Sequence, residues 1–487
     1  MSSRSHSRRR RRCDPVRRVA YTALLATETR GAYANLALAE QLRMSALTGR
    51  DAAFATELVD GTARGTGSWD RIIAAAGGRP ASTLQPGVRV VLRMACHQIL
   101  QMRVPTHAAV GTSVDLAAHV IGERVTGLVN AVARKISLHG LPEWAEIIAP
   151  DDPVEQLAIA TLHPRWIVTE YAELLAGDES LDSEDHAPDG GAGCDEVRRA
   201  LMADNIAATP TLVVRPGLAT VDELLAQGAS ACEYSRFGAH RAGNPREVPA
   251  VADGRAGVQD EGSQLVATAL ADACDVDGPW VDICAGPGGK AALLAGLAAE
   301  HHRFFAAGEL HPHRARLVAN ALAPIPGDHT VLVADGTHPP VRPGVCAAVM
   351  TDVPCSGLGA LRRRPESRWR ERDLDTLVLL QRSLLHNAIA LARPGGVIGY
   401  VTCSPHHRET TEVVCQALRH EPVEALDTPS LMAGVPDCAT GPDGRFVQLW
   451  PHRHGTDAMF CAVLRRTSLT AVTGCLGGHI EAVARDL

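Results

Sequence analysis

The stretch Val281-Asp282-Ile283-Cys284-Ala285-Gly286-Pro287-Gly288-Gly289-Lys290 decides the fold of the second half of the chain. It reads as a short apolar strand, a glycine-rich turn and the start of a helix. Glycine lets a backbone approach a ligand closely, and a helix N-terminus favours negative charge. The loop is neither a G-x-G-x-x-G fingerprint nor a Walker A loop, because its glycine spacing differs and no Ser or Thr follows Lys290.

Short apolar segments alternate with helical stretches around this loop. Strands are predicted at residues 280–284, 304–308, 330–334, 347–352 and 396–402. Such strands, separated by helices, predict a parallel sheet that is covered on both faces. In these sheets ligands bind beyond the carboxyl ends of the strands, so polar residues at those ends are candidate site residues.

Acidic residues end the two strands that follow the glycine-rich loop. Glu309 lies twenty residues past Gly289, where a carboxylate would accept hydrogen bonds from both hydroxyls of a ribose. Asp335 ends the third strand and is placed to meet an adenine amino group. The loop and the two acids, in this order, predict a nucleoside cofactor.

Two thiols follow the fourth and fifth strands. The chain has 13 Cys without any C-x-x-C pair, which predicts free thiols in a reducing compartment and no structural zinc site. A buried Cys is usually a small hydrophobic residue, and this interpretation holds for eleven of them, including Cys284 as far as nucleophilic catalysis is concerned. Cys355 and Cys403 follow two adjacent strands, at the same edge of the sheet as Asp352. They are therefore predicted to act in catalysis.

The charge of the chain is unevenly distributed. The net charge is −7, but the first twenty residues carry eight Arg against one Asp, so they hold +7 and the remainder holds −14. RNA binding is therefore expected to depend on local Arg patches. Only two of the 48 basic residues are Lys, and Lys290 is one of them. The segment at 361–372 (LRRRPESRWRER) is predicted to contact phosphates through Arg362, Arg363, Arg364 and Arg368.

The chain is expected to divide into five parts. Residues 1–15 read as a disordered Arg-rich tail and 16–140 as an all-helical domain, with apolar residues at three- and four-residue steps over 86–102 and 125–136. Asp51 is predicted to cap a helix over 52–64. Residues 141–260 read as a linker and small α+β module with a flexible acidic insertion at 178–196, 261–466 as the α/β domain, and 467–487 as a C-terminal tail. No apolar run approaches the length of a membrane span, and the free thiols suit a reducing cytosol, so a cytoplasmic protein is expected.

Three motifs together resemble the Sun/Nop-type RNA cytosine-C5 methyltransferases: DICAGPGGK at 282–290, DVPCS at 352–356 and TCS at 402–404. The resemblance continues at 258–260, 393–397 and 454–460. Residues 16–140 look like the NusB-type helical RNA-binding domain, which is joined to this catalytic unit in the RsmB (Sun) group of bacterial small-subunit rRNA methyltransferases. The match leaves out only the Arg-rich tail, the acidic insertion and the last twenty residues.

The resemblance implies an all-α NusB-like domain, a small α+β connector and a Rossmann-like class I methyltransferase domain that uses S-adenosyl-L-methionine. Cys403 would attack cytosine C6, and Cys355 would assist collapse of the adduct. Asp352 would hydrogen-bond the cytosine N3 and amino group. Lys290 would contact either the methionine carboxylate or the base and a nearby thiol. The cofactor site would consist of Cys284, Ala285, Gly286, Pro287, Gly288, Gly289, Lys290, Glu309, Asp335 and Asp352.

The expected activity is methylation of cytosine C5 in 16S rRNA, with RNA as the partner and with no metal, membrane or obligate protein partner. Cys355 competes for the role of nucleophile, because DNA cytosine-C5 methyltransferases use a Pro-Cys thiol. The alternatives are methylation of tRNA, an antitermination-type RNA-binding module with a vestigial methylase, and a nicotinamide oxidoreductase. A nicotinamide oxidoreductase would need a G-x-G-x-x-G fingerprint at the first turn, and the chain does not have one there.

Overall fold

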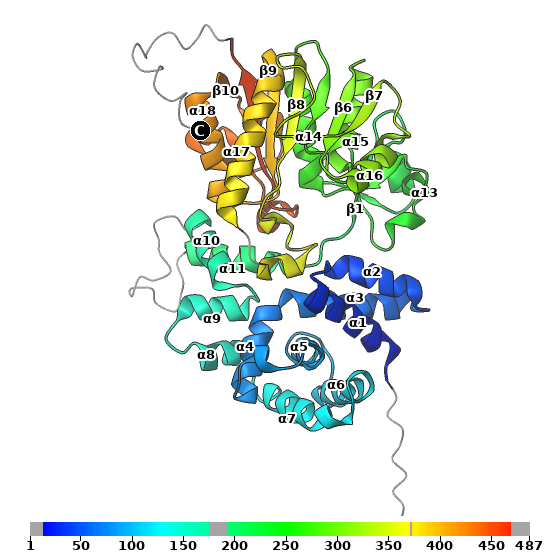
Figure 1. The fold of residues 1–487 in the computed structure, drawn as a ribbon, viewed down its shortest axis with the longest axis vertical. Helices are drawn as coiled ribbons and strands as arrows, with labels where there is room; N and C mark the ends of the chain where they lie inside the picture. Colours follow the sequence, from blue (N-terminus) through cyan, green and yellow to red (C-terminus); the bar gives the residue numbers. More distant parts are fainter. Residues whose placement is uncertain (1–12, 176–191, 371–372, 469–487) are drawn as a thin grey trace, which may run out of the picture. The chain divides into compact units, whose positions relative to one another are not determined.

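The computed structural model describes residues 13–175, 192–370 and 373–468 (Figure 1). The chain forms two compact units, Met1–Ala207 with Leu361–Glu371 and Ala208–Ala360 with Arg372–Leu487. Most of the predicted Arg-rich tail (1–12), most of the acidic insertion (178–191) and residues 469–487 lie outside the described residues. Residues 192–196 of the predicted insertion are helical.

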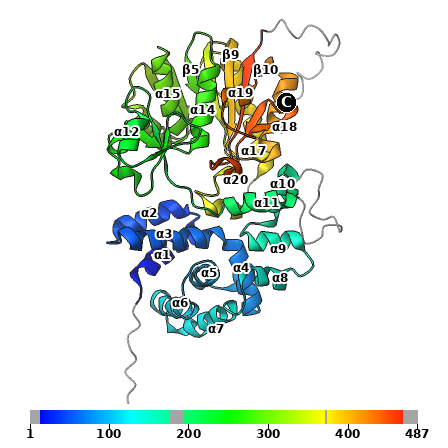
Figure 2. The ribbon, with the colours of Figure 1, turned by 180° about the vertical axis from the view of Figure 1, so that it is seen from behind.

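The first unit is helical, as predicted (Figure 2). Asp14 accepts a hydrogen bond from the Val16 amide and Gly31 ends the first helix with a φ of 65°, so both ends of that helix are capped. Asp51 is not the predicted cap, because Thr48 occupies the N-cap position and Asp51 lies in the first turn. The helices are α1 (Pro15–Arg30), α2 (Ala34–Met44), α3 (Gly49–Arg64), α4 (Thr66–Gly77), α5 (Pro86–Leu100), α6 (Thr106–Val120), α7 (Thr126–Ile136), α8 (Leu141–Ile148), α9 (Pro153–Ala160), α10 (Arg165–Leu175) and α11 (Ala192–Ala203).

The predicted module at 141–260 is divided between the two units. Residues 141–207 belong to the helical unit, where Leu141 and Trp144 join its apolar core. Residues 208–260 belong to the second unit and form an antiparallel sheet of order β2-β3-β1-β4. Its strands are β1 (Thr211–Val214), β2 (Ser230–Ala231), β3 (Gly238–His240) and β4 (Ala256–Val258), accompanied by α12 (Val221–Ala226) and α13 (Pro249–Ala252).

The second unit is built on a larger mixed sheet, and all five predicted strands are present. They run parallel in the order β7-β6-β5-β8-β9, with β5 at the centre. An antiparallel strand, β13, pairs with β9 and extends the sheet. The strands are β5 (Trp280–Asp282), β6 (Phe305–Glu309), β7 (His329–Val333), β8 (Cys346–Asp352), β9 (Ala392–Thr402), β10 (Val423–Ala425), β11 (Ala439–Thr440), β12 (Phe446–Gln448) and β13 (Phe460–Arg466).

Helices cover both faces of the parallel strands (Figure 1). Alternate residues of β5 point to opposite faces: Trp280 joins the core under α14 (Glu261–Ala273), α15 (Gly289–Glu300) and α16 (Pro312–Leu322), whereas Val281 joins the core under α17 (Leu374–Leu391) and α18 (Thr411–His420). The loops at the carboxyl ends of the strands are therefore free to form the site. Among the described residues, no helix is both long and apolar enough to span a membrane.

Candidate active site

The glycine-rich loop connects β5 to α15 and has little room for side chains. Gly286 and Gly288 have φ values of 56° and 97°, which favour glycine. A Cβ on Gly288 would lie 3.0 Å from the Val318 Cα, so α16 packs directly against the loop. The Ala285 amide donates to the Gly308 carbonyl (2.9 Å), which ties the loop to β6. Gly288 provides no side-chain cap for α15, so the first amides of that helix suit an anionic group.

The predicted ribose and adenine residues lie beyond the next two strands. Glu309 ends β6, is buried, and accepts a hydrogen bond from the His311 amide (2.9 Å). Asp335 is exposed in the turn after β7 rather than at the predicted strand end. Its Oδ1 accepts from the Thr337 hydroxyl and amide, and these hydrogen bonds lower the pKa of the carboxyl. The glycine cradle and the two acidic side chains fit a nucleoside cofactor.

Asp282 is a third acidic residue that the sequence argument did not single out. It ends β5, and its Oδ1 accepts from the Cys284 amide (3.0 Å), whereas its buried Oδ2 has no protein partner. Burial raises the pKa of Asp282 to about 7. Its position at the end of the strand before the glycine-rich loop could have marked it as a site residue. Sequence does not reveal that its carboxylate is fully buried.

The two predicted catalytic thiols lie side by side. The Sγ atoms of Cys355, after β8, and Cys403, after β9, are 3.4 Å apart. The hydrogen bond from Cys355 lowers the pKa of Cys403, and the charge of Lys290 acts in the same direction. The same bond, with burial, raises the pKa of Cys355. These opposite shifts make Cys403 the more acidic thiol of the pair.

Lys290 connects the glycine-rich loop to Asp352, at the end of β8. Its Nζ lies 3.0 Å from Oδ2 of Asp352. Burial opposes a charge on Lys290, but the Asp352 carboxylate outweighs it and raises the pKa of the ammonium group. Of the two roles left open by the sequence, this contact favours a role beside the base and the thiol. The structure thus brings together all four predicted catalytic residues.

A buried carboxylate that sequence analysis missed lies next to the thiols. Glu409, on a single 3-10 turn after β9, accepts hydrogen bonds from Ser356 and Ser404, the residues that directly follow the two cysteines. Close packing also holds this region, because a Cβ on Gly359 would lie 1.9 Å from the Ala458 carbonyl oxygen. No motif predicted Glu409, since its partners come from three separate segments.

The basic segment at 361–370 belongs to the helical unit. Arg368 was predicted to contact RNA, but this is wrong: its side chain is fully buried, and it donates to the Leu162 carbonyl (3.0 Å), Asn205 Oδ1 (2.8 Å) and the Asp204 carbonyl (3.3 Å). Trp369 is fixed as well, because its Nε1 donates to the Arg64 carbonyl (2.8 Å). Charge alone could not distinguish a surface arginine from a buried one.

The other predicted arginines remain at the surface. Arg363 and Arg364 are exposed and Arg362 is half-buried. The guanidinium groups of Arg364 and Arg370 lie 5.5 and 4.3 Å from the ring centroid of Tyr33. This cluster places cations around an aromatic ring at the surface, an arrangement that suits both phosphates and bases.

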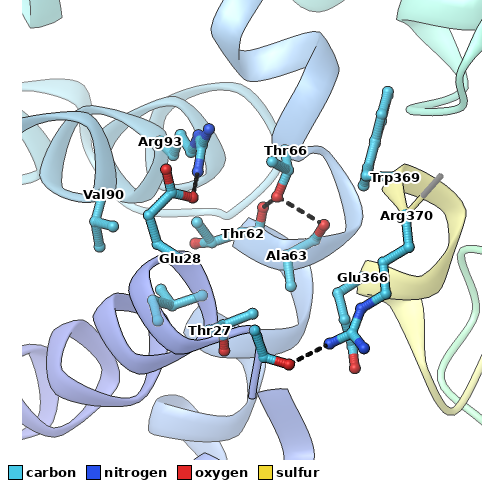
Figure 3. A pocket seen from close by; sticks show the side chains of 12 residues that line it. Thr27, Glu28, Thr62, Ala63, Thr66, Val90, Arg93, Glu366, Trp369 and Arg370 are labelled. Carbon is cyan, nitrogen blue, oxygen red and sulfur yellow. Dashed lines mark hydrogen bonds and ion pairs between the residues drawn. The ribbon is translucent and has the colours of Figure 1, made fainter. Parts of the chain in front are cut away.

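The helical unit contains a cavity of about 230 Å³ beside this segment (Figure 3). Glu366, Trp369 and Arg370 face it from one side, and Arg370 donates to the Gly31 carbonyl (3.1 Å). The cavity contains none of the predicted catalytic or cofactor residues, so it is separate from the site described above.

A parallel sheet with the order β7-β6-β5-β8-β9, a glycine cradle at the central strand and an antiparallel β13 define a Rossmann-like methyltransferase fold. Comparisons with known proteins agree. The model of the family described as 16S rRNA methyltransferase RsmB/F matches residues 269–465, and the NusB family model matches residues 14–137.

The chain belongs to the RsmB/F methyltransferase family, and its cofactor is S-adenosyl-L-methionine. A putative methyltransferase of Mycobacterium tuberculosis is 45% identical over 96% of this chain and 100% of its own length. A probable ribosomal RNA small subunit methyltransferase B of Bacillus subtilis is 29% identical over 93% and 98%. The crystal structure of PH0851 has the same fold, with a TM-score of 0.72 and 21% identity over 94% of this chain and all of that one.

Proposed function

We propose that this protein methylates C5 of a cytosine in small-subunit rRNA through a covalent bond between Cys403 and cytosine C6, with Cys355 assisting release. The observation that carries the proposal is the pair of thiols 3.4 Å apart, of which Cys403 has the lowered pKa. The matched family and the names of the relatives support rRNA as the substrate.

Cytosine C5 is a poor nucleophile until a thiolate has added to C6. When the Cys403 sulfur bonds to C6, the electrons of the C5–C6 double bond become available at C5, and N3 takes up a proton from solvent. The Asp352 carboxylate, which accepts a hydrogen bond from Lys290, would accept hydrogen bonds from the protonated N3 and from the amino group of the base. S-adenosyl-L-methionine supplies the methyl group that C5 accepts.

Release then requires that C5 pass its proton to a water molecule and that the C5–C6 double bond re-form as the bond between Cys403 and C6 breaks. N3 returns its proton to solvent in the same step. Cys355 Sγ lies 3.4 Å from Cys403 Sγ, so a hydrogen bond from the Cys355 S–H would stabilise the Cys403 sulfur as it leaves. Glu309 and Asp335 would bind the ribose and adenine of the cofactor, and the segment from Cys284 to Lys290 would surround its methionine part.

RNA would be bound in part by Arg362, Arg363 and Arg364, with Tyr33 and Arg370 beside them. A base that reacts with a thiol in a crevice must leave its stack, so the target cytosine is expected in a loop or in an extruded position. The match to the NusB family over residues 14–137 supports an RNA-binding role of the helical unit.

The test is incubation of wild type, Cys403→Ala and Cys355→Ala with the cofactor and undermethylated small-subunit rRNA. Denaturing gels measure the covalent adduct, and mass spectrometry of RNA digests measures 5-methylcytidine. Cys355→Ala should accumulate the adduct, whereas Cys403→Ala should form neither adduct nor product. Cys415→Ala, in α18, is the matched control and should behave as wild type.

The opposite pattern would exchange the roles of the two cysteines. A parallel reaction with tRNA identifies the substrate class, because methylation of tRNA alone would contradict the rRNA assignment. If wild type methylates neither RNA, the proposed activity is wrong.

A further inference from the structure

Glu409 lies at the centre of a hydrogen-bond network behind the two thiols. The side chain is fully buried. Its Oε1 accepts from the Ser356 amide (2.8 Å) and from Gln381 Nε2 (3.0 Å). Its Oε2 accepts from the hydroxyls of Ser404 (2.7 Å) and Ser356. A carboxylate has about four acceptor positions, so these four donors use all of them.

Two of the donors to Glu409 are neighbours of the two cysteines in the sequence. Ser356 directly follows Cys355, and Ser404 directly follows Cys403. One carboxylate therefore binds the residue after each thiol, although the two thiols belong to loops from different strands. Hydrogen bonds to a charged acceptor are shorter and stronger than neutral ones, which suits a group that must fix two loops.

Two further contacts restrain the same loops. Gln381, from α17, also donates to the Pro354 carbonyl (2.9 Å), so the backbone is held on both sides of Cys355. The Tyr400 hydroxyl donates to the carbonyl of Glu409 (2.7 Å), which attaches the 3-10 turn to β9 just before Cys403. The four donors to the carboxylate are all neutral. A buried charge held by neutral donors is costly unless every bond is made, so the geometry of the network is strongly specified.

We propose that Glu409 is a positioning residue that sets the separation of Cys355 and Cys403 and thereby the efficiency of adduct formation and release. For the reaction itself this inference rests on the proposed function. The separation of the thiols, however, is a property of the free protein and can be measured without RNA or cofactor.

The experiment compares Glu409→Gln with Glu412→Gln in the full-length protein. Glu412 is exposed three residues further on, so its variant makes the same chemical change without touching the network. Each protein is treated with diamide, and peptide mass spectrometry follows the disulfide between Cys355 and Cys403. In that step both S–H bonds break, one S–S bond forms and the two hydrogens pass to the azo nitrogens of the reagent.

In Glu409→Gln an amide group replaces one carboxylate oxygen and faces donors. We expect disulfide formation at least tenfold slower than in wild type. Single-turnover methylation should fall by about 100-fold, because a misplacement of about 1 Å in an active site has an effect of that size. Binding of S-adenosyl-L-methionine, measured by calorimetry, should stay within twofold and shows that the variant is folded. Glu412→Gln should match wild type in all three measurements.

Ser404→Ala removes a single hydrogen-bond donor to Glu409. It is the second test variant and replaces Glu409→Gln if that protein does not fold. It should slow disulfide formation and methylation by a smaller factor, with unchanged cofactor binding. Wild-type rates of disulfide formation in a folded Glu409→Gln or Ser404→Ala protein would overturn the inference. If disulfide formation is slowed but wild type itself yields no 5-methylcytidine, the proposed function fails and the positioning role of Glu409 remains.

Discussion

The hydrogen bond between the two thiols shifts the pKa values of two chemically identical side chains in opposite directions. Cys355 and Cys403 both follow strand ends, but the hydrogen bond between them and the nearby charge of Lys290 lower the pKa of Cys403 alone. Both effects stabilise its thiolate. Sequence placed the two thiols at the same sheet edge, whereas the difference between them depends on atomic positions.

Removal of the donor should change the titration of the acceptor. Cys355→Ala eliminates the hydrogen bond that is the largest cause of the lowered pKa of Cys403. We therefore expect the pKa of Cys403 to rise, measured as the pH dependence of its alkylation by iodoacetamide in peptide digests. Cys415→Ala is the control. An unchanged or lowered pKa of Cys403 would contradict the assignment of donor and acceptor.

Asp282 should make the stability of the second unit depend on pH. Burial raises its pKa to about 7, above the value of about 3.9 in an unfolded chain, so the folded state holds a proton that the unfolded state releases. The associated stability is present below about pH 4 and is lost as the pH rises through about 7. In Asp282→Asn the side-chain oxygen can still accept from the Cys284 amide. Because the amide group does not titrate, the variant should not lose stability as the pH rises.

The measurement is the melting temperature of Asp282→Asn relative to wild type at pH 5, 6.5 and 8. The corresponding difference in the free energy of unfolding should grow in favour of the variant with rising pH, by on the order of 2 kcal/mol over this range. Asp277→Asn, at an exposed position before β5, should show no such trend. A difference that is constant with pH would mean that Asp282 is charged in the folded protein.

At the scale of elements, the predicted strands and their order along the chain were confirmed because buried parallel strands have a distinct apolar pattern. The loop, Glu309 and the two thiols could be located for the same reason, since each follows a strand. Arg368 and Glu409 could not be interpreted correctly. Their environments are formed by segments far away in sequence, and neither carries a local pattern that reports burial.

The segment at 361–370 is expected to stabilise the helical unit chiefly through Arg368. Arg368→Met keeps the aliphatic part of the side chain but leaves buried acceptors at Leu162, Asp204 and Asn205 without their donor. The free energy of unfolding should fall by about 3 kcal/mol, measured by urea denaturation. Arg363→Met, exposed in the same segment, should change it by about 0.5 kcal/mol or less. Equal effects of the two substitutions would contradict a structural role of Arg368.

At the scale of the whole molecule, a chain of net charge −7 must bind RNA through local clusters of positive charge. The double variant Arg363→Gln, Arg364→Gln should weaken RNA binding. It should also reduce the slope of log K against log salt by about 0.7–0.9 for each lost phosphate contact. Fluorescence anisotropy with an rRNA fragment over a salt series measures both. Arg419→Gln, exposed on α18, is the control, and a slope equal to wild type in the double variant would exclude these contacts.

The same segment has a consequence for biosynthesis. Residues 361–370 complete a helical unit whose other described parts end at Ala207, so the unit is discontinuous in the chain. During translation its helices leave the ribosome long before Arg368 and Trp369 do. More than 150 residues of the second unit are made before Arg368 and Trp369. During that time the nascent helical unit lacks the buried guanidinium group of Arg368 and the indole of Trp369 that packs on Gly67. The first unit can therefore complete its packing only after the cysteine motif at 352–356, which precedes the segment, has been synthesised.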